Sequence, residues 1–228
     1  MSEFTGFSKE MTGFFKELAA NNTKLWFNEH KKTYKLSVKK PCMDFVDAMG
    51  QKLGTLVPGI HAIPKINQSL FKIHRDIRFS NDKRPFKTNM GLWFWEGVGK
   101  RMECSGFYFH LEEDQLMLGC GIYMFPKELL ASFREAVVDK KFGKQLPGVI
   151  KKLTGNGYNI GRLHYKKTPR GFDSSHPNAE YLLYNGLHAG ITMPIPDAFY
   201  SADILDLAFE HYQKMLPLHQ WLNKAVVG

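Results

Sequence analysis

The chain has 228 residues, of which 43% are hydrophobic and 23% charged, so it can bury a core and does not have the composition of a disordered protein. Lys and Arg number 31 against 22 Asp and Glu, a net charge of +9 that favours anionic partners. Three cysteines without a CxxC pair, and an N-terminus without an apolar signal core, indicate a cytoplasmic protein without a disulfide framework. No apolar run approaches the length of a membrane span, so we expect no membrane partner.

The first quarter of the chain has helical periodicity. Ser8 can cap a first helix, which Asn21 and Asn22 should end because Asn tolerates turn conformations. A longer helical stretch follows, and Pro41 either kinks it or starts a new helix that stops at Gly54. These patterns predict a helical N-terminal region.

After turns near Pro58 and Pro64, the hydrophobic period changes to that of strands. Glu113 and Asp114 supply turn chemistry, which predicts a hairpin. The short links indicate an antiparallel meander of four expected strands: Ser69–His74, Met90–Trp95, Gly106–Glu112 and Gln115–Met124.

The remainder of the chain returns to helix. Phe125 and Pro126 open one helix, and Gln145–Leu153 is a further helical piece. An irregular region with short strands precedes a last helix from about Ser201 to Val226. Helices, then strands, then helices predict an α+β fold, an antiparallel sheet of about four or more strands packed by N-terminal and C-terminal helices. Without a repeat or linker, one domain over residues 1–228 is the simplest organisation.

The segment from Phe71 to Thr88 is the most distinctive part of the sequence. Turn residues around Ser80 and the fixed backbone of Pro85 should place its charges at a strand end and on the loop beyond it. Loops held by a rigid scaffold often carry binding groups. Two acids stand among six basic residues, which are Lys72, Arg75, Arg78, Lys83, Arg84 and Lys87. The excess of four positive charges predicts an anion site.

The side chains of this segment allow more than one interpretation. Arg75 and Arg78 can offer forked donors to a phosphate or carboxylate. Asp76 and Asp82 could orient those guanidinium groups, act as a base or bind a metal. Phe79 and Phe86 could stack on bases. The alternative is an internal ion-pair network that holds the loop to the body of the protein.

Other candidates lie outside this segment. Tyr108 and His110 alternate along one strand and should face the same side, where His110 could act as acid or base or have only a structural partner. Arg170, in a rigid turn, could join the basic cluster in space or be a solvated loop residue. Gly119 and Gly121 on one strand suggest a bulge or a close approach of ligand or backbone. Scattered histidines lack metal-ligand spacing, so we expect no metal site, and no motif identifies a cofactor.

Several of these stretches together resemble one family, called Domain of Unknown Function 2461. The resemblance rests on Asn21-Asn22 followed by Trp26-Phe27, on RDIRFSNDKRPFKT, on Gly119-Cys120-Gly121 and on Pro169-Arg170-Gly171-Phe172, and it covers nearly the whole chain. The family often has Tyr where this chain has Phe86. The resemblance implies one intracellular domain, supplies no established activity, and directs the first tests to eight residues: Arg75, Asp76, Arg78, Phe79, Asp82, Lys83, Lys87 and Arg170.

Three functions are compatible with these observations. The first is a binding module for a phosphate-bearing ligand, either a nucleotide or a nucleic acid. The second is an enzyme acting on a small anionic substrate, in which Arg75 and Arg78 clamp the anion while Asp76, Asp82 or His110 moves protons. The third is a structural or interaction protein stabilised by an ion-pair network. The sequence does not indicate the oligomeric state.

Overall fold

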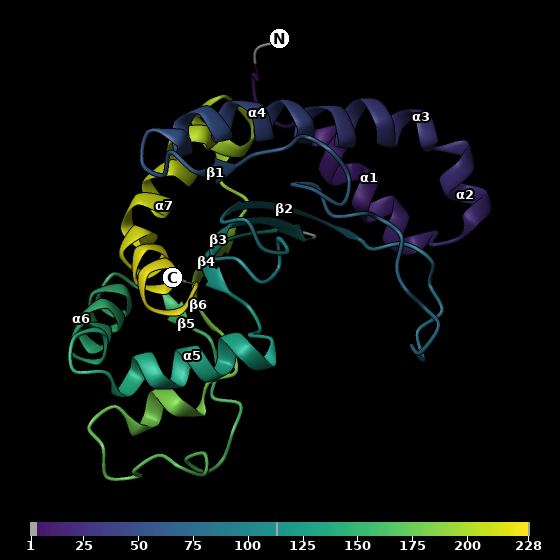
Figure 1. Cartoon of the computed structure of the whole chain (residues 1–228). Coiled ribbons are helices and arrows are strands. Elements are labelled where there is room, and N and C mark those ends of the chain that lie inside the picture. Colours follow the sequence, from purple (N-terminus) through teal and green to yellow (C-terminus); the bar gives the residue numbers. More distant parts are fainter. Residues whose placement is uncertain (1–3, 113, 228) are drawn as a thin grey trace. The chain divides into compact units, whose positions relative to one another are not determined.

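The computed structural model describes residues 4–112 and 114–227. It has the predicted α+β fold, with an antiparallel sheet of six strands in the order β1-β2-β3-β4-β6-β5 (Figure 1). The hairpin turn predicted at Glu113 and Asp114 includes Glu113, which lies outside the described residues.

The residue contacts divide the chain into two compact units. Unit 1 consists of the described residues within Met1–Phe94, Tyr108–Leu118 and Thr192–Glu210. Unit 2 consists of those within Trp95–Phe107, Gly119–Ile191 and His211–Gly228. The single domain over residues 1–228 stays a prediction.

The helices of unit 1 begin where the sequence predicts. The Ser8 side chain accepts a hydrogen bond from the Met11 N–H and caps α1 (Lys9–Ala20), and the backbone N–H of Asn21 closes the last turn on Glu17. Short helices α2 (Lys24–Glu29) and α3 (Lys31–Thr33) lead into a π-helical segment, η1 (Tyr34–Lys39). Helix α4 (Lys40–Gly54) follows directly, with Pro41 as its second residue, where the π-helical segment passes into α-helix.

The core of unit 1 lies between helices and sheet. Its strand elements are β1 (Ile60–His61) and parts of β2 (Asn89–Glu96), β3 (Gly106–Glu112), β4 (Gln115–Ile122) and β6 (Leu187–Pro194). Phe45 of α4 packs on Phe94 of β2 and Phe109 of β3, with ring centroids 6.4 and 4.7 Å apart. Phe7 stacks at 4.7 Å on Phe199, which belongs to the short helix η3 (Asp197–Tyr200). Alternate residues of β2 and β3 therefore face these helices.

Unit 2 has its own aromatic core. Helices α5 (Lys127–Val138) and α6 (Phe142–Gly155) pack with η2 (Ala179–Leu183), β5 (Asn159–Ile160), the later part of α7 (Asp203–Leu222) and η4 (Asn223–Val227). Phe133 of α5 lies 4.8 Å from the Phe125 ring and 6.2 Å from Trp221. The buried Asn178 amide donates to the carbonyls of Val137 and Gly143, which joins η2 to α5 and α6.

The strand predicted at Ser69–His74 is wrong, because the run divides between two partners. The carbonyl of Ser69 and the N–H of Phe71 bond to the β2 residues Trp93 and Gly91. Two residues later, the Ile73 carbonyl accepts from Lys87 and the Arg75 N–H donates to Pro85. Only isolated bridges result, so the segment leaves the sheet and forms its own narrow loop.

The described residues contain no helix that is long and apolar enough to cross a membrane. The three cysteines are free and buried. Burial raises the pKa of all three thiols, which keeps them protonated and unreactive.

Candidate functional site

Residues 71–88, here called the basic loop, project from unit 1. Figure 1 shows this segment, between β1 and β2, extending away from α1 and α2 as two adjacent limbs. The base of the loop is fixed by Asn22, which donates to the Phe86 carbonyl and accepts from the Phe86 N–H, both at 3.0 Å. The Phe86 ring is buried and stacks on Phe27 at 4.1 Å. The prediction that Phe86 stacks on bases is therefore wrong, because the ring is already packed inside the protein.

Ion pairs between loop residues shape the two limbs. Asp76 holds Arg78 through two hydrogen bonds, of 2.9 Å to Nε and 2.6 Å to Nη2. Asp82 pairs with Arg84 at 2.8 Å and with Arg75 at 2.6 Å. Because Arg75 and Asp82 belong to opposite limbs, that pair joins the two sides of the loop. All of these partners belong to the loop itself, so the pairs order it from within.

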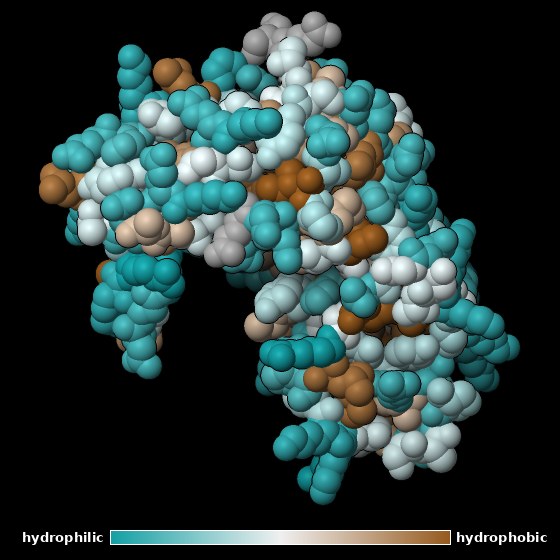
Figure 2. Space-filling model, turned by 180° about the vertical axis from the view of Figure 1, so that it is seen from behind, coloured by the Kyte–Doolittle hydropathy of each residue, from teal (hydrophilic) through white to brown (hydrophobic). Residues whose placement is uncertain are grey.

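These pairs leave much of the charge facing solvent. The side chain of Arg78 is 75% exposed and that of Arg84 is 58% exposed. Phe79, next to Arg78, is 95% exposed. In the reverse view of Figure 2, the corresponding projection is predominantly hydrophilic. A guanidinium held on one edge by a carboxylate still has donors on its other edge for an anion.

The two loop carboxylates are fixed in their charged form. Hydrogen bonds from Arg78 lower the pKa of Asp76, and hydrogen bonds from Arg84, with a smaller effect of Arg75, lower the pKa of Asp82. Groups that hold their negative charge this firmly are poor proton carriers near neutral pH. In this structure, Asp76 and Asp82 orient guanidinium groups.

Tyr108 and His110 lie on the same face of β3, as their alternation predicts. The Tyr108 hydroxyl is 2.9 Å from His110 Nδ1, and His110 Nε2 is 3.5 Å from a Glu112 carboxylate oxygen. Burial lowers the pKa of His110, an effect that Glu112 opposes and Lys87 reinforces. Burial and the Glu112 charge raise the pKa of Tyr108 to about 12. The three side chains form a chain of proton donors and acceptors.

The last residues of the basic loop reach this strand face. The Lys87 ammonium lies 5.6 Å from the centre of the Phe71 ring, which contacts the Tyr108 ring edge-on at 5.9 Å. Gly91 makes room for the tyrosine, since a Cβ at that position would lie 2.6 Å from its hydroxyl. Basic loop and polar strand face are therefore neighbours within unit 1.

The other predicted site residues differ in their placement. Lys83 lies in the loop and donates to the Ile77 carbonyl at 3.1 Å. Arg170 is an exposed residue of unit 2, so its joining the basic loop stays a prediction. Among the described residues, no group of three His, Cys, Asp or Glu side chains is arranged to hold a metal ion.

Sequence reasoning missed two contributors to this region. Asn22 looked like part of a helix end, and nothing in its neighbourhood indicates a partner 64 residues away. Glu112 extends the alternation of Tyr108 and His110 by one more step. Because side chains two residues apart on a strand face the same side, the sequence could have predicted Glu112 on this face.

Comparison with known families gives one match of nearly full length. The family model described as "Conserved hypothetical protein (DUF2461)" matches residues 10–221, which confirms the resemblance seen in the sequence. A search of curated proteins found no match.

Proposed function

The chain belongs to the DUF2461 family, and we propose that it binds a phosphate-bearing ligand, a nucleotide or a nucleic acid, through the basic loop. The observation that carries the proposal is the exposure of Arg78 and Phe79 side by side on a projecting loop of excess positive charge. A cytoplasmic location also stays part of the proposal.

The charges of the loop suit a phosphate chain better than a single anion. The cations are distributed along both limbs from Lys72 to Lys87, so a polymer can meet several of them at once. The internal ion pairs hold Arg75, Arg78 and Arg84 in place before any ligand arrives. Donors ordered in advance lose less side-chain entropy on binding.

Phe79 adds a contact for the bases. Its ring is almost fully exposed, and the Arg78 guanidinium lies 5.7 Å from the ring centre. An exposed ring beside a cation allows a base to stack while its phosphate is bound, as in proteins that bind single strands.

Fluorescence anisotropy at low salt tests the proposal with labelled single-stranded DNA, with RNA and with a labelled nucleotide. Phe79→Ala should weaken single-strand binding by about 1–3 kcal/mol, since that is the usual contribution of one stacked base. The matched control is Leu25→Ala on α2, which removes a side chain 71% exposed and should leave binding unchanged. Absence of affinity for all three probes would refute the proposal.

A second candidate function rests on the Tyr108–His110–Glu112 chain. A part-buried histidine with a lowered pKa, a tyrosine hydroxyl at one ring nitrogen and a carboxylate near the other can relay a proton. The positive charge of Lys87, which acts on His110, can attract a small anion. This arrangement supports an enzyme acting on a small anionic substrate, with His110 in place of the loop aspartates as the proton carrier.

Turnover of a mixture of small anionic metabolites, followed by NMR, tests this candidate. His110→Gln should reduce any conversion at least about 100-fold, because positioned acid–base groups contribute that much. Conversion at the wild-type rate by the folded His110→Gln protein would remove this candidate.

A further inference from the structure

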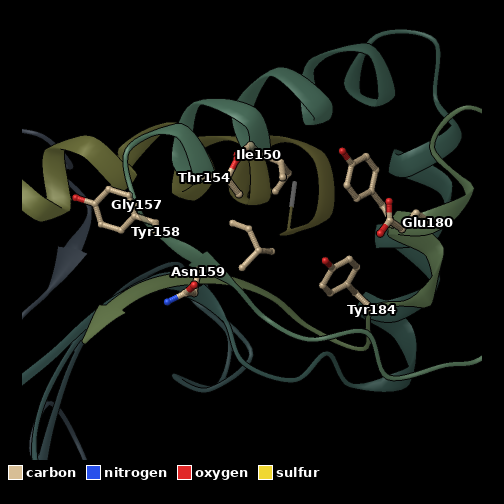
Figure 3. A pocket seen from close by; sticks show the side chains of 9 residues that line it. Ile150, Thr154, Gly157, Tyr158, Asn159, Glu180 and Tyr184 are labelled. Atoms are coloured by element: carbon tan, nitrogen blue, oxygen red, sulfur yellow. The ribbon is translucent and has the colours of Figure 1, made fainter. Parts of the chain in front are cut away.

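A pocket of about 390 Å³ opens in unit 2, and its lining includes none of the residues proposed above. Its walls are formed by α6 and by residues 157–160 around β5. The remaining wall comes from Glu180 and Tyr181 of η2 and from Tyr184, which caps the C-terminus of η2. Figure 3 shows Glu180 and Tyr184 on one side, with the Tyr184 hydroxyl directed toward the middle of the pocket. Its volume is within the usual range for small-molecule sites.

The lining has one formal charge in a chain that is basic overall. Of the nine residues that line the pocket, Glu180 alone carries a charge at neutral pH. Burial and the charge of Glu180 raise the pKa values of Tyr181 and Tyr184, which places the carboxylate within electrostatic reach of both phenols and keeps both rings neutral. The one charge among the lining side chains therefore favours a cation, in contrast to the excess of positive charge on the basic loop.

The aromatic side chains have the chemistry that binds organic cations. Neutral tyrosine rings attract an ammonium group through the negative potential of their faces, and aromatic cages for quaternary ammonium ions use the same interaction. Tyr158 contributes at the far side, with its hydroxyl bonded to His211 Nδ1 at 2.8 Å and turned away from the pocket in Figure 3. Its hydroxyl is thus already occupied.

We propose that this pocket binds a small organic cation, a protonated or quaternary amine, with its charge against Glu180 and its alkyl groups against Tyr181 and Tyr184. The site is separate from the basic loop and does not depend on the ligand proposed there.

NMR titration of the protein with choline tests the inference, with 3,3-dimethylbutan-1-ol as the uncharged molecule of the same shape. Choline should shift the ring signals of Tyr181 and Tyr184 and bind at least about tenfold more tightly than the alcohol, because only the cation gains the charge interactions. Equal affinity for the two molecules, or no shift with choline, would overturn it.

Variants identify the residues responsible. Glu180→Gln and Tyr184→Ala should each weaken choline binding several-fold, whereas Tyr184→Phe keeps the ring and should retain most of the affinity. Glu128→Gln removes an exposed carboxylate on α5 outside the pocket lining and controls for net charge. Since Tyr184→Ala could unfold the protein, Glu180→Gln at an exposed position is the decisive variant. Wild-type affinity in Glu180→Gln would contradict the assignment.

Discussion

At the scale of single residues, the ionisable side chains have two different roles. Asp76 and Asp82 stay charged and orient arginine side chains, whereas His110 can exchange a proton near neutral pH. The carboxylates of Asp76 and Asp82 are held ionised by arginine, while His110 is held neutral by burial. The histidine has neighbours of both signs, a carboxylate at 3.5 Å and the Lys87 ammonium, and each should act on its pKa.

The pKa of His110 should therefore move in opposite directions in two variants. Glu112→Gln removes the charge that favours the imidazolium and should lower the pKa, whereas Lys87→Gln removes a repelling charge and should raise it. Titration of the His110 ring signals by NMR measures both. Shifts of the same sign, or none, would show that the strand face and the loop are not coupled.

At the scale of elements, the junction between helix and loop decides the position of the basic loop. The side chain of Asn22 satisfies both backbone groups of Phe86, in a part-buried position. Such a bidentate contact has no substitute when the amide is removed, since water has limited access to a part-buried site.

Asn22→Ala should lower the free energy of unfolding by about 1–3 kcal/mol, because two part-buried backbone groups lose their partner. Asn21→Ala is the matched control and should cost less, since the Asn21 side chain donates to the Glu17 carbonyl at an exposed position. Urea denaturation compares the two, and limited proteolysis should show faster cleavage within residues 71–88 in Asn22→Ala alone. Equal effects of both substitutions would mean that the contact does not fix the loop.

At Gly121 of strand β4, the backbone of the neighbouring strand β6 approaches closely. Gly121 has φ +127°, and a Cβ there would lie 2.3 Å from the Leu187 carbonyl oxygen. Gly121→Ala should cost about 1–3 kcal/mol from backbone strain, with the clash in addition. Gly148→Ala on α6, where nothing lies within 4 Å, should be neutral or stabilise by up to about 1 kcal/mol. Thermal denaturation of the pair measures the difference.

Local patterns predicted most of the elements but not their partners. Ser8 as a cap, Gly54 as a helix end and the strand β3 (Gly106–Glu112) follow from residues close in sequence. The close approach at Gly121 was one of the two meanings predicted for the glycines of that strand, and the structure shows backbone as the neighbour.

Partners distant in sequence account for the errors and omissions. Ser69–His74 has a strand-like composition but changes hydrogen-bonding partner in its middle. The contact from Asn22 to Phe86 spans 64 residues, and the pocket beside Glu180 combines α6 with η2. None of these pairings is encoded by a local period or motif.

At the scale of the whole molecule, three histidines with lowered pKa values make stability depend on pH. Burial is the main cause at His110, His188 and His219. As pH falls below their unfolded value of 6.5, the unfolded chain takes up protons before the folded protein does. The contribution of these histidines is thus complete above pH 6.5 and is lost below it.

The melting temperature should fall between about pH 7.5 and 5.5, a range in which carboxylates with pKa values near 4 hardly titrate. Differential scanning calorimetry in buffers of constant ionic strength measures the change. A constant or rising melting temperature over this range would show that the three histidines are not held neutral in the folded protein.

If the basic loop binds the phosphates of the ligand, single-strand affinity must depend on salt through the cations of this loop. For the wild type, log K should fall linearly with log salt, by about 0.7 per phosphate contact. Replacing Lys72 and Lys83 with Gln removes two loop cations and keeps the ion pairs that Asp76 and Asp82 make with arginine, so the slope should become shallower by about 1.4. The exposed pair Lys151 and Lys152 on α6, replaced with Gln, changes net charge equally and should leave the slope unchanged. The same slope in wild type and loop variant would contradict phosphate binding by the basic loop. A slope that becomes equally shallow in the α6 control would contradict it as well.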